Sequence, residues 1–302
     1  MGKRLYLLAP AKINLHLEVL RRRKDGYHDI VSLFQAVSLY DEIELRSLKK
    51  KNAYRLEGDI SIPAEDNIIT KVVELFRQES GNYSGIEIGV QKHIPVGAGL
   101  GGGSSDAAAV LIGLDRFFSV GLSTPQLLHL AERLGSDVPF FLRSAAALVQ
   151  GRGEMVTPIE ARSDYFLVLI FPGFAIESRE AYRWLDEARD STGRESPGIS
   201  RIDVLKKEYQ NGAIDRWTFF NSFQGVVASR FPAVKHTITA LYRCGALYSC
   251  LSGSGSSLYG LYASDKEAAS ACKELQTEYP LVEIAKPLQK LRWPDYNDGV
   301  CP

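Results

Sequence analysis

The stretch Ile94-Pro95-Val96-Gly97-Ala98-Gly99-Leu100-Gly101-Gly102-Gly103-Ser104-Ser105-Asp106 decides the fold, because five glycines stand within seven positions directly before an expected helix. Glycine lets the backbone take positive φ and lets a ligand approach without a Cβ atom in the way. The N–H groups of such a loop can point at an anion, and the first turn of the helix adds unpaired donors and the positive end of its dipole. We therefore interpret the loop as a phosphate-binding site rather than a flexible turn.

Two known phosphate-binding patterns can be compared with this loop. A Walker A loop ends in Gly-Lys followed by Ser or Thr, whereas Gly103 is followed by Ser104, so that pattern does not fit. Gly97-x-Gly99-x-x-Gly102 matches the dinucleotide fingerprint literally, but that fingerprint also requires a following strand that ends in an acidic residue. Here a second helix is expected next, and Asp115 falls inside the first one. A nicotinamide or flavin oxidoreductase is therefore the less favoured alternative.

Composition excludes several classes of protein. The chain has 302 residues, enough for two domains of ordinary size. Its 36 basic and 36 acidic side chains give a net charge of zero, which argues against a nucleic-acid-binding protein. The four cysteines form no C-x-x-C pair, and no apolar stretch reaches the roughly 18 residues of a membrane-spanning helix. We expect a cytoplasmic protein without structural zinc and without a membrane segment.

Hydrophobic periodicity and turn residues predict a mixture of strands and helices. In the first half we expect strands at 4–20, 30–37, 42–45 and 86–90, with helices at 67–79, 104–118 and from Ser123-Thr124-Pro125 to Gly135. In the second half we expect strands at 165–170, 246–251, 257–262 and 281–285, helices at 178–190 and 265–278 with others before 243, and a loop at 190–200. Because strands and helices do not alternate regularly, an α+β fold is favoured, with a domain boundary near residue 160.

Two charged residues stand where they could take part in chemistry. Lys12 shares one face of the first strand with Asn14, His16 and Glu18, and on this pattern alone a solvent-facing lysine is the usual case. Asp137 follows a helix end and is more often a cap there, although its apolar neighbours would desolvate it and make it a better proton acceptor. Phosphoryl transfer to an alcohol needs positioning, charge neutralisation and a proton acceptor. Lys12, Asp137 and the loop would supply these parts, but sequence spacing does not show that they meet.

Three motifs together resemble a known family. Pro10-Ala11-Lys12-Ile13-Asn14-Leu15, the glycine loop, and Leu251-Ser252-Gly253-Ser254-Gly255-Ser256-Ser257 look like the three motifs of the GHMP kinases, which act on galactose, homoserine, mevalonate and related substrates. Gly26-Tyr27-His28 and Ser136-Asp137-Val138-Pro139-Phe140-Phe141 narrow the resemblance to the branch that phosphorylates a cytidine-diphosphate-linked methylerythritol in non-mevalonate isoprenoid synthesis. The resemblance extends from about Leu8 to Ala285.

The resemblance implies a fold and a reaction. It implies an α+β fold of two domains, residues 1–160 being ribosomal-protein-S5-like and residues 161–302 ferredoxin-like, with the active site in the cleft between them. The protein would be an ATP-dependent small-molecule kinase that uses magnesium to phosphorylate the 2-hydroxyl of the methylerythritol unit. The partner is then a small molecule, not a nucleic acid or a membrane. Neither the magnesium ligands nor the oligomeric state follow from the resemblance.

Motif positions also carry over individual roles. Asp137 would accept the hydroxyl proton, and Lys12 would orient the reacting groups. The loop residues that would wrap the ATP phosphates are Pro95, Val96, Gly97, Ala98, Gly99, Leu100, Gly101, Gly102, Gly103, Ser104 and Ser105. Lys92 and Asn67 would lie near adenine. The substrate contacts would be Asn14, Tyr27, His28, Ser178 and Tyr182, the last placed by counting from Phe171-Pro172-Gly173.

Some features leave alternatives open. Asp106 stands where many members of the family have Asn, a small change that suits the helix dipole. Tyr182 could equally be a helix-packing residue. A sister GHMP kinase with another alcohol substrate would keep the loop and Asp137 but would have no use for Tyr27, His28 and Tyr182. A non-catalytic nucleotide-binding protein would have no need of both Lys12 and Asp137.

Overall fold

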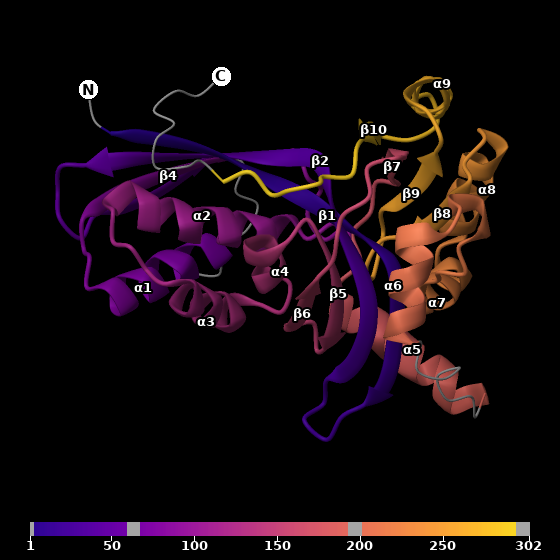
Figure 1. Ribbon diagram of the computed structural model, residues 1–302, viewed down its shortest axis with the longest axis horizontal. Coiled ribbons are helices and arrows are strands. Elements are labelled where there is room, and N and C mark those ends of the chain that lie inside the picture. The colour runs from indigo at the N-terminus through magenta and orange to yellow at the C-terminus, as the bar shows by residue number, and fades with distance from the viewer. Residues whose placement is uncertain (1–2, 59–66, 193–200, 294–302) are drawn as a thin grey trace.

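Two long paired strands, β1 (Arg4–Arg22) and β2 (His28–Leu48), connect the two halves of the molecule (Figure 1). The computed structural model describes residues 3–58, 67–192 and 201–293. The hairpin turn lies at Asp25-Gly26, as the sequence predicted, with Gly26 at a φ of 87°. The prediction of two strands at 30–37 and 42–45 was wrong, since β2 is continuous. An irregularity in its pairing with β1 absorbs the residues between them.

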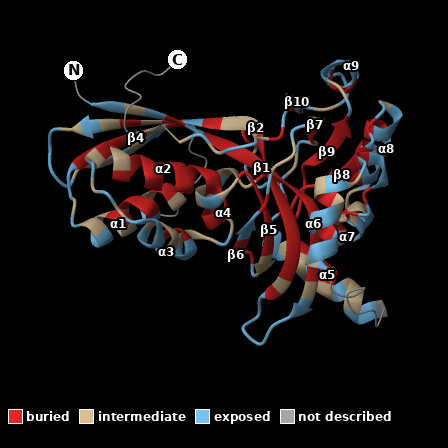
Figure 2. Ribbon diagram, in the orientation of Figure 1, coloured by how far each residue is buried: buried red, intermediate tan, exposed pale blue. Residues whose placement is uncertain are grey.

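A six-stranded sheet forms the first half. It has the order β3-β4-β2-β5-β6, and β1 adds to β2. The remaining strands are β3 (Tyr54–Gly58), β4 (Gly85–Gln91), β5 (Ala146–Gly151) and β6 (Met155–Pro158), and the helices are α1 (Ile68–Ser80), α2 (Gly102–Phe118), α3 (Thr124–Leu134) and α4 (Val138–Arg143). The sequence missed β3, β5, β6 and α4. Helix α2 is the most buried of these helices (Figure 2), because its run Ala107-Ala108-Ala109 lets it approach the sheet closely.

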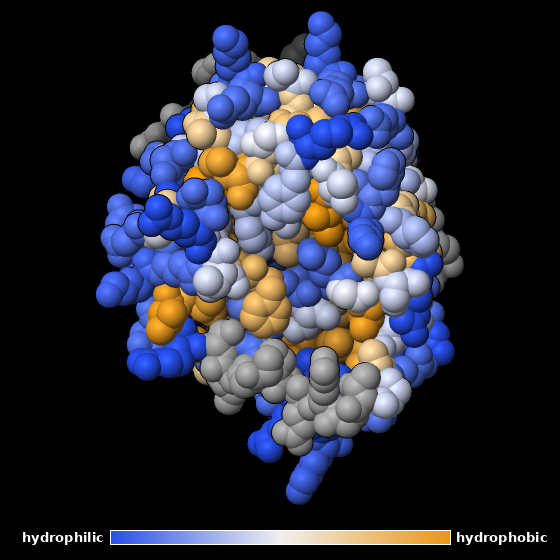
Figure 3. Space-filling model, turned by 90° about the vertical axis from the view of Figure 1, so that its right-hand side faces the viewer, coloured by the Kyte–Doolittle hydropathy of each residue, from blue (hydrophilic) through white to orange (hydrophobic). Residues whose placement is uncertain are grey.

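A four-stranded antiparallel sheet forms the second half, in the order β10-β7-β9-β8. Its strands are β7 (Phe166–Phe171), β8 (Tyr248–Leu251), β9 (Leu258–Tyr262) and β10 (Leu281–Ala285), and its helices are α5 (Ser178–Thr192), α6 (Ile202–Asn211), α7 (Ser222–Arg230), α8 (Pro232–Arg243) and α9 (Asp265–Leu275). On the face of this half turned to the viewer in Figure 3, hydrophilic side chains predominate and apolar ones form small separate patches. The mixed strands and helices confirm the α+β class.

The polar face of β1 is buried between the halves, not exposed to solvent. Lys12 is 4% exposed, and Asn14, His16 and Glu18 are buried as well. The second half covers this face, because Tyr259 donates its hydroxyl to the Asn14 carbonyl at 2.9 Å and the Leu17 N–H donates to Phe220 at 2.8 Å. Burial lowers the pKa of His16 to about 4, so that ring is neutral at pH 7. The alternative of a solvent-facing lysine is thereby excluded; strand alternation could not decide it, since it does not reveal what covers each face.

The segment after β10 returns to the first sheet and lies across β2 (Figure 1). Ser38 donates its N–H to the Lys286 carbonyl at 2.9 Å, and Leu288 donates to Ala36 at 2.9 Å. Trp293 then donates its indole N–H to the Phe141 carbonyl at 3.2 Å. A domain boundary near residue 160 stays a prediction. Of the expected loop at 190–200, the first residues complete α5 and residues 193–200 lie outside the described part.

Candidate active site

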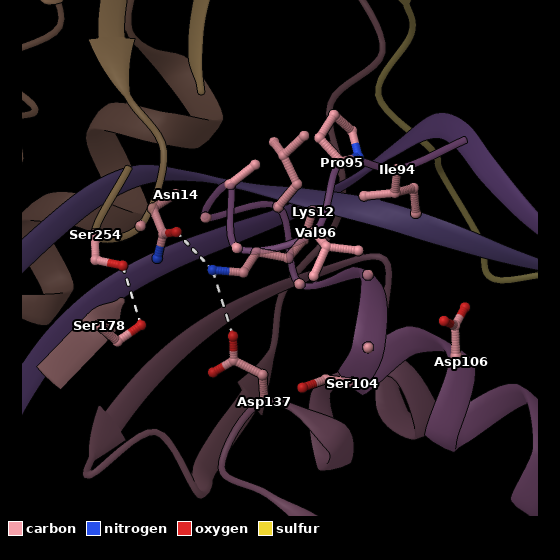
Figure 4. A pocket seen from close by; sticks show the side chains of 18 of the residues that line it. Lys12, Asn14, Ile94, Pro95, Val96, Ser104, Asp106, Asp137, Ser178 and Ser254 are labelled. Atoms are coloured by element: carbon pink, nitrogen blue, oxygen red, sulfur yellow. Dashed lines mark hydrogen bonds and ion pairs between the residues drawn. The ribbon is translucent and has the colours of Figure 1, made fainter. Parts of the chain in front are cut away.

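A pocket of about 480 Å³ lies where the glycine loop, β1 and the start of α5 approach one another (Figure 4). Residues from both halves line it. Most of the predicted site residues are among them: Lys12, Asn14, Asn67, Lys92, the loop from Pro95 to Ser104, Asp137, Ser178 and Tyr182. The exceptions are Ser105, Tyr27 and His28, which do not line the pocket.

The glycine loop is held in one conformation by close contacts. Gly99 has a φ of 77°, and a Cβ atom there would lie 2.0 Å from the Ser252 carbonyl oxygen. Gly101 has a φ of 71°, and its Cβ would lie 2.9 Å from Cγ of Lys12. The Lys12 N–H donates to the Leu100 carbonyl at 2.9 Å, which ties the loop to β1. The glycines therefore serve close packing as well as backbone conformation.

Helix α2 begins at Gly102, two residues before the predicted start at Ser104. Its N-cap is Gly101, and no side chain caps the helix. The first N–H groups of α2 therefore remain unpaired by a cap and face the pocket rim, where the helix dipole favours an anion. Ser104 lines the pocket, whereas Ser105 is fully buried behind it, with a hydroxyl that has no partner among the described residues. The structure thus separates two serines that the sequence grouped together.

Lys12 and Asp137 meet in the pocket. The Lys12 Nζ lies 3.4 Å from Oδ2 of Asp137 and donates to Oδ1 of Asn14 at 2.7 Å (Figure 4). Asn14 is held in turn by a 3.0 Å hydrogen bond to the Ser32 hydroxyl. The Lys12 side chain is 5% exposed and that of Asp137 29%, so the carboxylate is the more accessible of the two. Asp137 stands at the N-cap position of α4 without making a capping bond, which leaves its oxygens available to a ligand.

A buried ion-pair cluster joins the two ends of the glycine loop. Lys92 lies between the carboxylates of Asp41 and Asp106, at 2.7 Å from Oδ2 of Asp106. Asp41 also accepts the N–H groups of His93 and Ile94 at 2.7 and 2.8 Å. Burial raises the pKa of Asp106 to about 7, although the charge of Lys92 acts in the opposite direction. The chain before the loop and the helix after it are therefore fixed to each other.

Of the three aromatic residues predicted to recognise a base, Tyr182 lines the other end of the pocket and His28 lies against it. His28 donates or accepts through Nε2 with Oδ1 of Asp186 at 2.8 Å, and its ring stacks on that of Tyr182 with centroids 4.9 Å apart. Tyr182 packs edge-on against Phe223, and burial, helped by the charge of Asp137, raises the pKa of Tyr182 to about 12. Tyr27 is 58% exposed just outside the pocket. The rings of Tyr27 and Tyr182 were predicted to stack on either side of a base, but here His28 lies against Tyr182.

Two other predicted residues have local partners in the pocket wall. Asn67 caps α1, since its side-chain oxygen accepts the Ile69 N–H at 2.9 Å. Ser178 at the start of α5 shares a 3.0 Å hydrogen bond with Ser254 of the third motif (Figure 4). Ser252 of the same motif donates its hydroxyl to the Gly99 carbonyl at 2.9 Å, so the third motif and α5 lie beside the glycine loop.

Sequence reasoning missed three residues at this site, namely Asp41, Arg152 and Asp186. Asp41 and Asp186 gave no signal, because each acts on a partner far along the chain. Arg152 had a weak one, since Gly151-Arg152-Gly153 has two glycines in positive φ and indicates a tight turn. Nothing in that pattern shows that the turn reaches the pocket.

Several chemical alternatives can be tested against this geometry. Helix α2 is followed by α3 rather than by a strand, and all strand pairs except β3 with β4 are antiparallel, so the fold is not a dinucleotide-binding βαβ fold. Within the described ranges, no three His, Cys, Asp or Glu side chains are grouped so that they could hold a metal ion. Among the same residues, no helix combines the length and apolar character needed to cross a membrane.

Family models and relatives agree with the motifs. The model of the GHMP kinases N terminal domain matches residues 67–145, and that of the GHMP kinases C terminal matches residues 204–281. The 4-diphosphocytidyl-2-C-methyl-D-erythritol kinase of Treponema pallidum is 38% identical over 275 residues, which cover 90% of this chain and 94% of that protein. The kinase of the same name from Thermotoga maritima is 38% identical over 262 residues, covering 86% and 93%.

Solved structures match over almost the whole length. A crystal structure of a 4-(cytidine 5'-diphospho)-2C-methyl-D-erythritol kinase has a TM-score of 0.80 at 30% identity and covers 93% of this chain and 98% of that one. Homoserine kinase from Cytophaga hutchinsonii, at 20% identity and a TM-score of 0.74, covers 96% and 97% and shares the fold. With relatives above 30% identical over nearly their full length, this chain belongs to the 4-diphosphocytidyl-2-C-methyl-D-erythritol kinase family of the GHMP kinases.

Proposed function

We propose that this chain transfers the γ-phosphoryl group of ATP to the 2-hydroxyl of 4-diphosphocytidyl-2-C-methyl-D-erythritol. The single observation that supports this most strongly is the Lys12–Asp137 pair, 3.4 Å apart, in the same pocket as the uncapped N-terminus of α2. A proton acceptor (Asp137), a cation (Lys12) and an anion-binding loop therefore line the same pocket. These are the parts that phosphoryl transfer to an alcohol requires.

The reaction can be followed atom by atom. The glycine loop and the first turn of α2 hold the phosphates of ATP, so that the γ-phosphorus faces Asp137. The substrate oxygen forms a bond to that phosphorus while its proton passes to a carboxylate oxygen of Asp137. The bond from phosphorus to the bridging oxygen breaks, and its electron pair leaves with ADP. Lys12 balances the negative charge around the transferred group.

Magnesium would enter bound to the ATP phosphates. Mg²⁺ usually keeps several waters and takes one or two protein oxygens beside phosphate, and this mode needs no group of three His, Cys, Asp or Glu side chains, of which the described residues have none. The hydroxyl of Ser104 lines the pocket at the first turn of α2 and is an oxygen donor that could hold it. Its chemistry would be charge neutralisation on the phosphates.

Substrate recognition rests on the aromatic end of the pocket. His28 stacks on Tyr182 there and Tyr27 precedes His28 in the chain; an aromatic ring can stack on cytosine while a ring nitrogen bonds its polar edge. For cytosine to stack on Tyr182 in place of His28, the two rings must separate by about one aromatic thickness. The substrate-binding roles of these residues and a cytoplasmic location are part of this proposal.

The direct test is an acceptor panel. Purified full-length chain is incubated with ATP, Mg²⁺ and one alcohol at a time, and ADP release and ³¹P NMR are recorded. We expect a new phosphomonoester signal with 4-diphosphocytidyl-2-C-methyl-D-erythritol and only background with homoserine, mevalonate and galactose. Equal or faster turnover of one of those three would assign the chain to a sister kinase.

A further inference from the structure

The substrate assigned above carries a diphosphate between its cytidine and its reacting alcohol, and that diphosphate needs a partner in the protein. The pocket contains three cationic side chains, Lys12, Lys92 and Arg152. Lys12 is paired with Asp137, and Lys92 lies between Asp41 and Asp106. Arg152 forms no ion pair with a carboxylate among the described residues, and Asp25 nearby is paired with Arg23 at 3.2 Å.

Arg152 stands on a turn that is built to hold it in place. The turn joins β5 to β6, with Gly151 and Gly153 at φ of 67° and 119°. Glu154 folds back so that its carboxylate accepts the Arg152 N–H at 2.6 Å. The acidic side chain of the turn is thereby engaged with backbone, which leaves the guanidinium of Arg152 directed to other partners.

The turn lies between the two ends of the substrate site. On one side, the guanidinium carbon of Arg152 is 5.0 Å from the centre of the Tyr27 ring, and Gly151 pairs with Ile30 of β2. On the other side, a Cβ atom on Gly153 would lie 3.0 Å from Cβ of Ser136 and 3.7 Å from Oδ1 of Asp137. The predicted base-stacking residue and the predicted general base thus both adjoin the same turn.

We propose that Arg152 is a substrate-binding residue that takes the diphosphate of the acceptor. This inference rests on the proposed function, because it assumes a nucleoside at Tyr27 and a reacting alcohol at Asp137. A chain that links those two points passes the Arg152 turn. A guanidinium binds adjacent phosphate oxygens with two parallel hydrogen bonds, and its long stem can follow the ligand from the Tyr27 ring.

The test compares ligands that differ in phosphate. Cytidine, CMP and CDP are titrated into the full chain by calorimetry, with the ATP site filled by a non-hydrolysable ATP analogue. We expect the wild type to bind CDP about 10- to 100-fold more tightly than cytidine, since charge-assisted bonds are the strong ones. In Arg152→Met, the ratio should fall to within about threefold while cytidine binding is kept. Arg152→Lys should retain part of the preference.

A matched control is available in the chain. Arg230 also lies 5.0 Å from an aromatic ring, that of Trp184, but outside the pocket. Arg230→Met removes a similar cation–π contact and should leave the CDP-to-cytidine ratio unchanged. In steady-state assays, Arg152→Met should raise KM for the cytidyl substrate about 10- to 100-fold, with KM for ATP and kcat within about threefold.

The outcomes separate the two proposals. If wild-type protein binds neither cytidine nor CDP, the cytidyl substrate is wrong. If it binds both and Arg152→Met keeps the preference for CDP, the role of Arg152 is overturned while the function stands. The role is equally overturned if cytidine and CDP binding fall together, which would mean that Arg152 only supports Tyr27. A fall in kcat at constant KM would indicate that Arg152 contacts the transferred phosphoryl group, and would also contradict its proposed role in binding the acceptor diphosphate.

Discussion

The two ends of the pocket are built in opposite ways. At the glycine-loop end, positioning comes from backbone and from a buried cluster: Asp106 is 3% exposed, and Asp41 bonds two successive N–H groups. At the aromatic end, positioning comes from side chains of both halves, and Tyr27 is 58% exposed. The first end is formed before any ligand arrives, whereas the second needs its ligand to be complete. We therefore expect changes at the loop end to alter stability and ATP binding together, and changes at the aromatic end to alter acceptor binding alone.

The largest effect is expected where the two ends meet. Asp137→Asn removes the proton acceptor and should lower kcat by about 10²- to 10⁴-fold. Because the Asp137 side chain is 29% exposed, the unfolding temperature should change little. Binding of an ATP analogue by calorimetry is the control and should be kept. Activity within tenfold of the wild type would remove Asp137 from the mechanism.

The glycine loop offers a matched pair. Gly99→Ala places a Cβ atom 2.0 Å from the Ser252 carbonyl at positive φ, so the free energy of unfolding should fall by about 1–3 kcal/mol or more. KM for ATP should rise with it. Gly103→Ala is the control for stability alone, since nothing in the protein lies within 4 Å of its Cβ position although Gly103 lines the pocket. Thermal unfolding and ATP kinetics are measured for both variants. An equal loss of stability in the two would mean that the close contact of Gly99 with Ser252 does not fix the loop.

The aromatic end should respond in acceptor kinetics alone. Tyr27→Ala removes a stacking surface, and base–aromatic stacking of about 1–3 kcal/mol corresponds to a KM for the cytidyl substrate at least about fivefold higher. The unfolding temperature and KM for ATP should not move. Tyr83→Ala, at an equally exposed tyrosine that does not line this pocket, is the control. An unchanged acceptor KM would contradict the cytidine assignment.

The smallest effect is a pH dependence at the loop end. The pKa of Asp106 is about 7 in the folded chain against an ordinary value of 3.8, so the folded state binds this proton more tightly than the unfolded chain does. The stability from this group is present below about pH 4 and is lost as the pH rises through about 7. Asp106→Asn does not titrate and should therefore gain stability relative to the wild type between about pH 5 and pH 8.

Thermal unfolding across that pH range measures the difference. Asp215→Asn, at an exposed aspartate without an ion pair among the described residues, is the control and should parallel the wild type. Parallel curves for Asp106→Asn and the wild type would show that the proton on Asp106 is not bound more tightly on folding.

The glycine-loop end of the pocket could be predicted from the sequence better than the aromatic end. The glycine loop and its helix were predictable because their signal is local, in successive residues. The proximity of Lys12 and Asp137 was suggested by the family resemblance, since 125 positions of chain separate them. His28 and Asp186 are 158 positions apart, and only the packing of α5 against the hairpin brings them together. Asp186 was therefore not predictable from a single sequence.

The errors have physical causes as well. The Ser38–Asp41 stretch was interpreted as a gap between strands, but β2 continues through it with a bulge at Ser38 and Leu39, which face no residue of β1. The sequence could not show that the polar face of β1 is buried. Apolar and polar residues alternate along a strand in the same way whether the polar face meets water or another part of the protein. Helix α2 begins at Gly102, two residues before the predicted start at Ser104. Glycine has a weak helix propensity, but in the first turn it suits a phosphate site.

The segment from Lys286 to Trp293 has a consequence for biosynthesis. The groups of β2 that it pairs, the Ser38 N–H and the Ala36 carbonyl, are translated well before their partners at Lys286 and Leu288. Until residue 288 has been translated, this part of the first sheet has incomplete pairing. We expect the nascent first half to be aggregation-sensitive and to reach protease resistance only after residues 286–288 have emerged, which ribosome-bound chains stalled before and after that point would reveal.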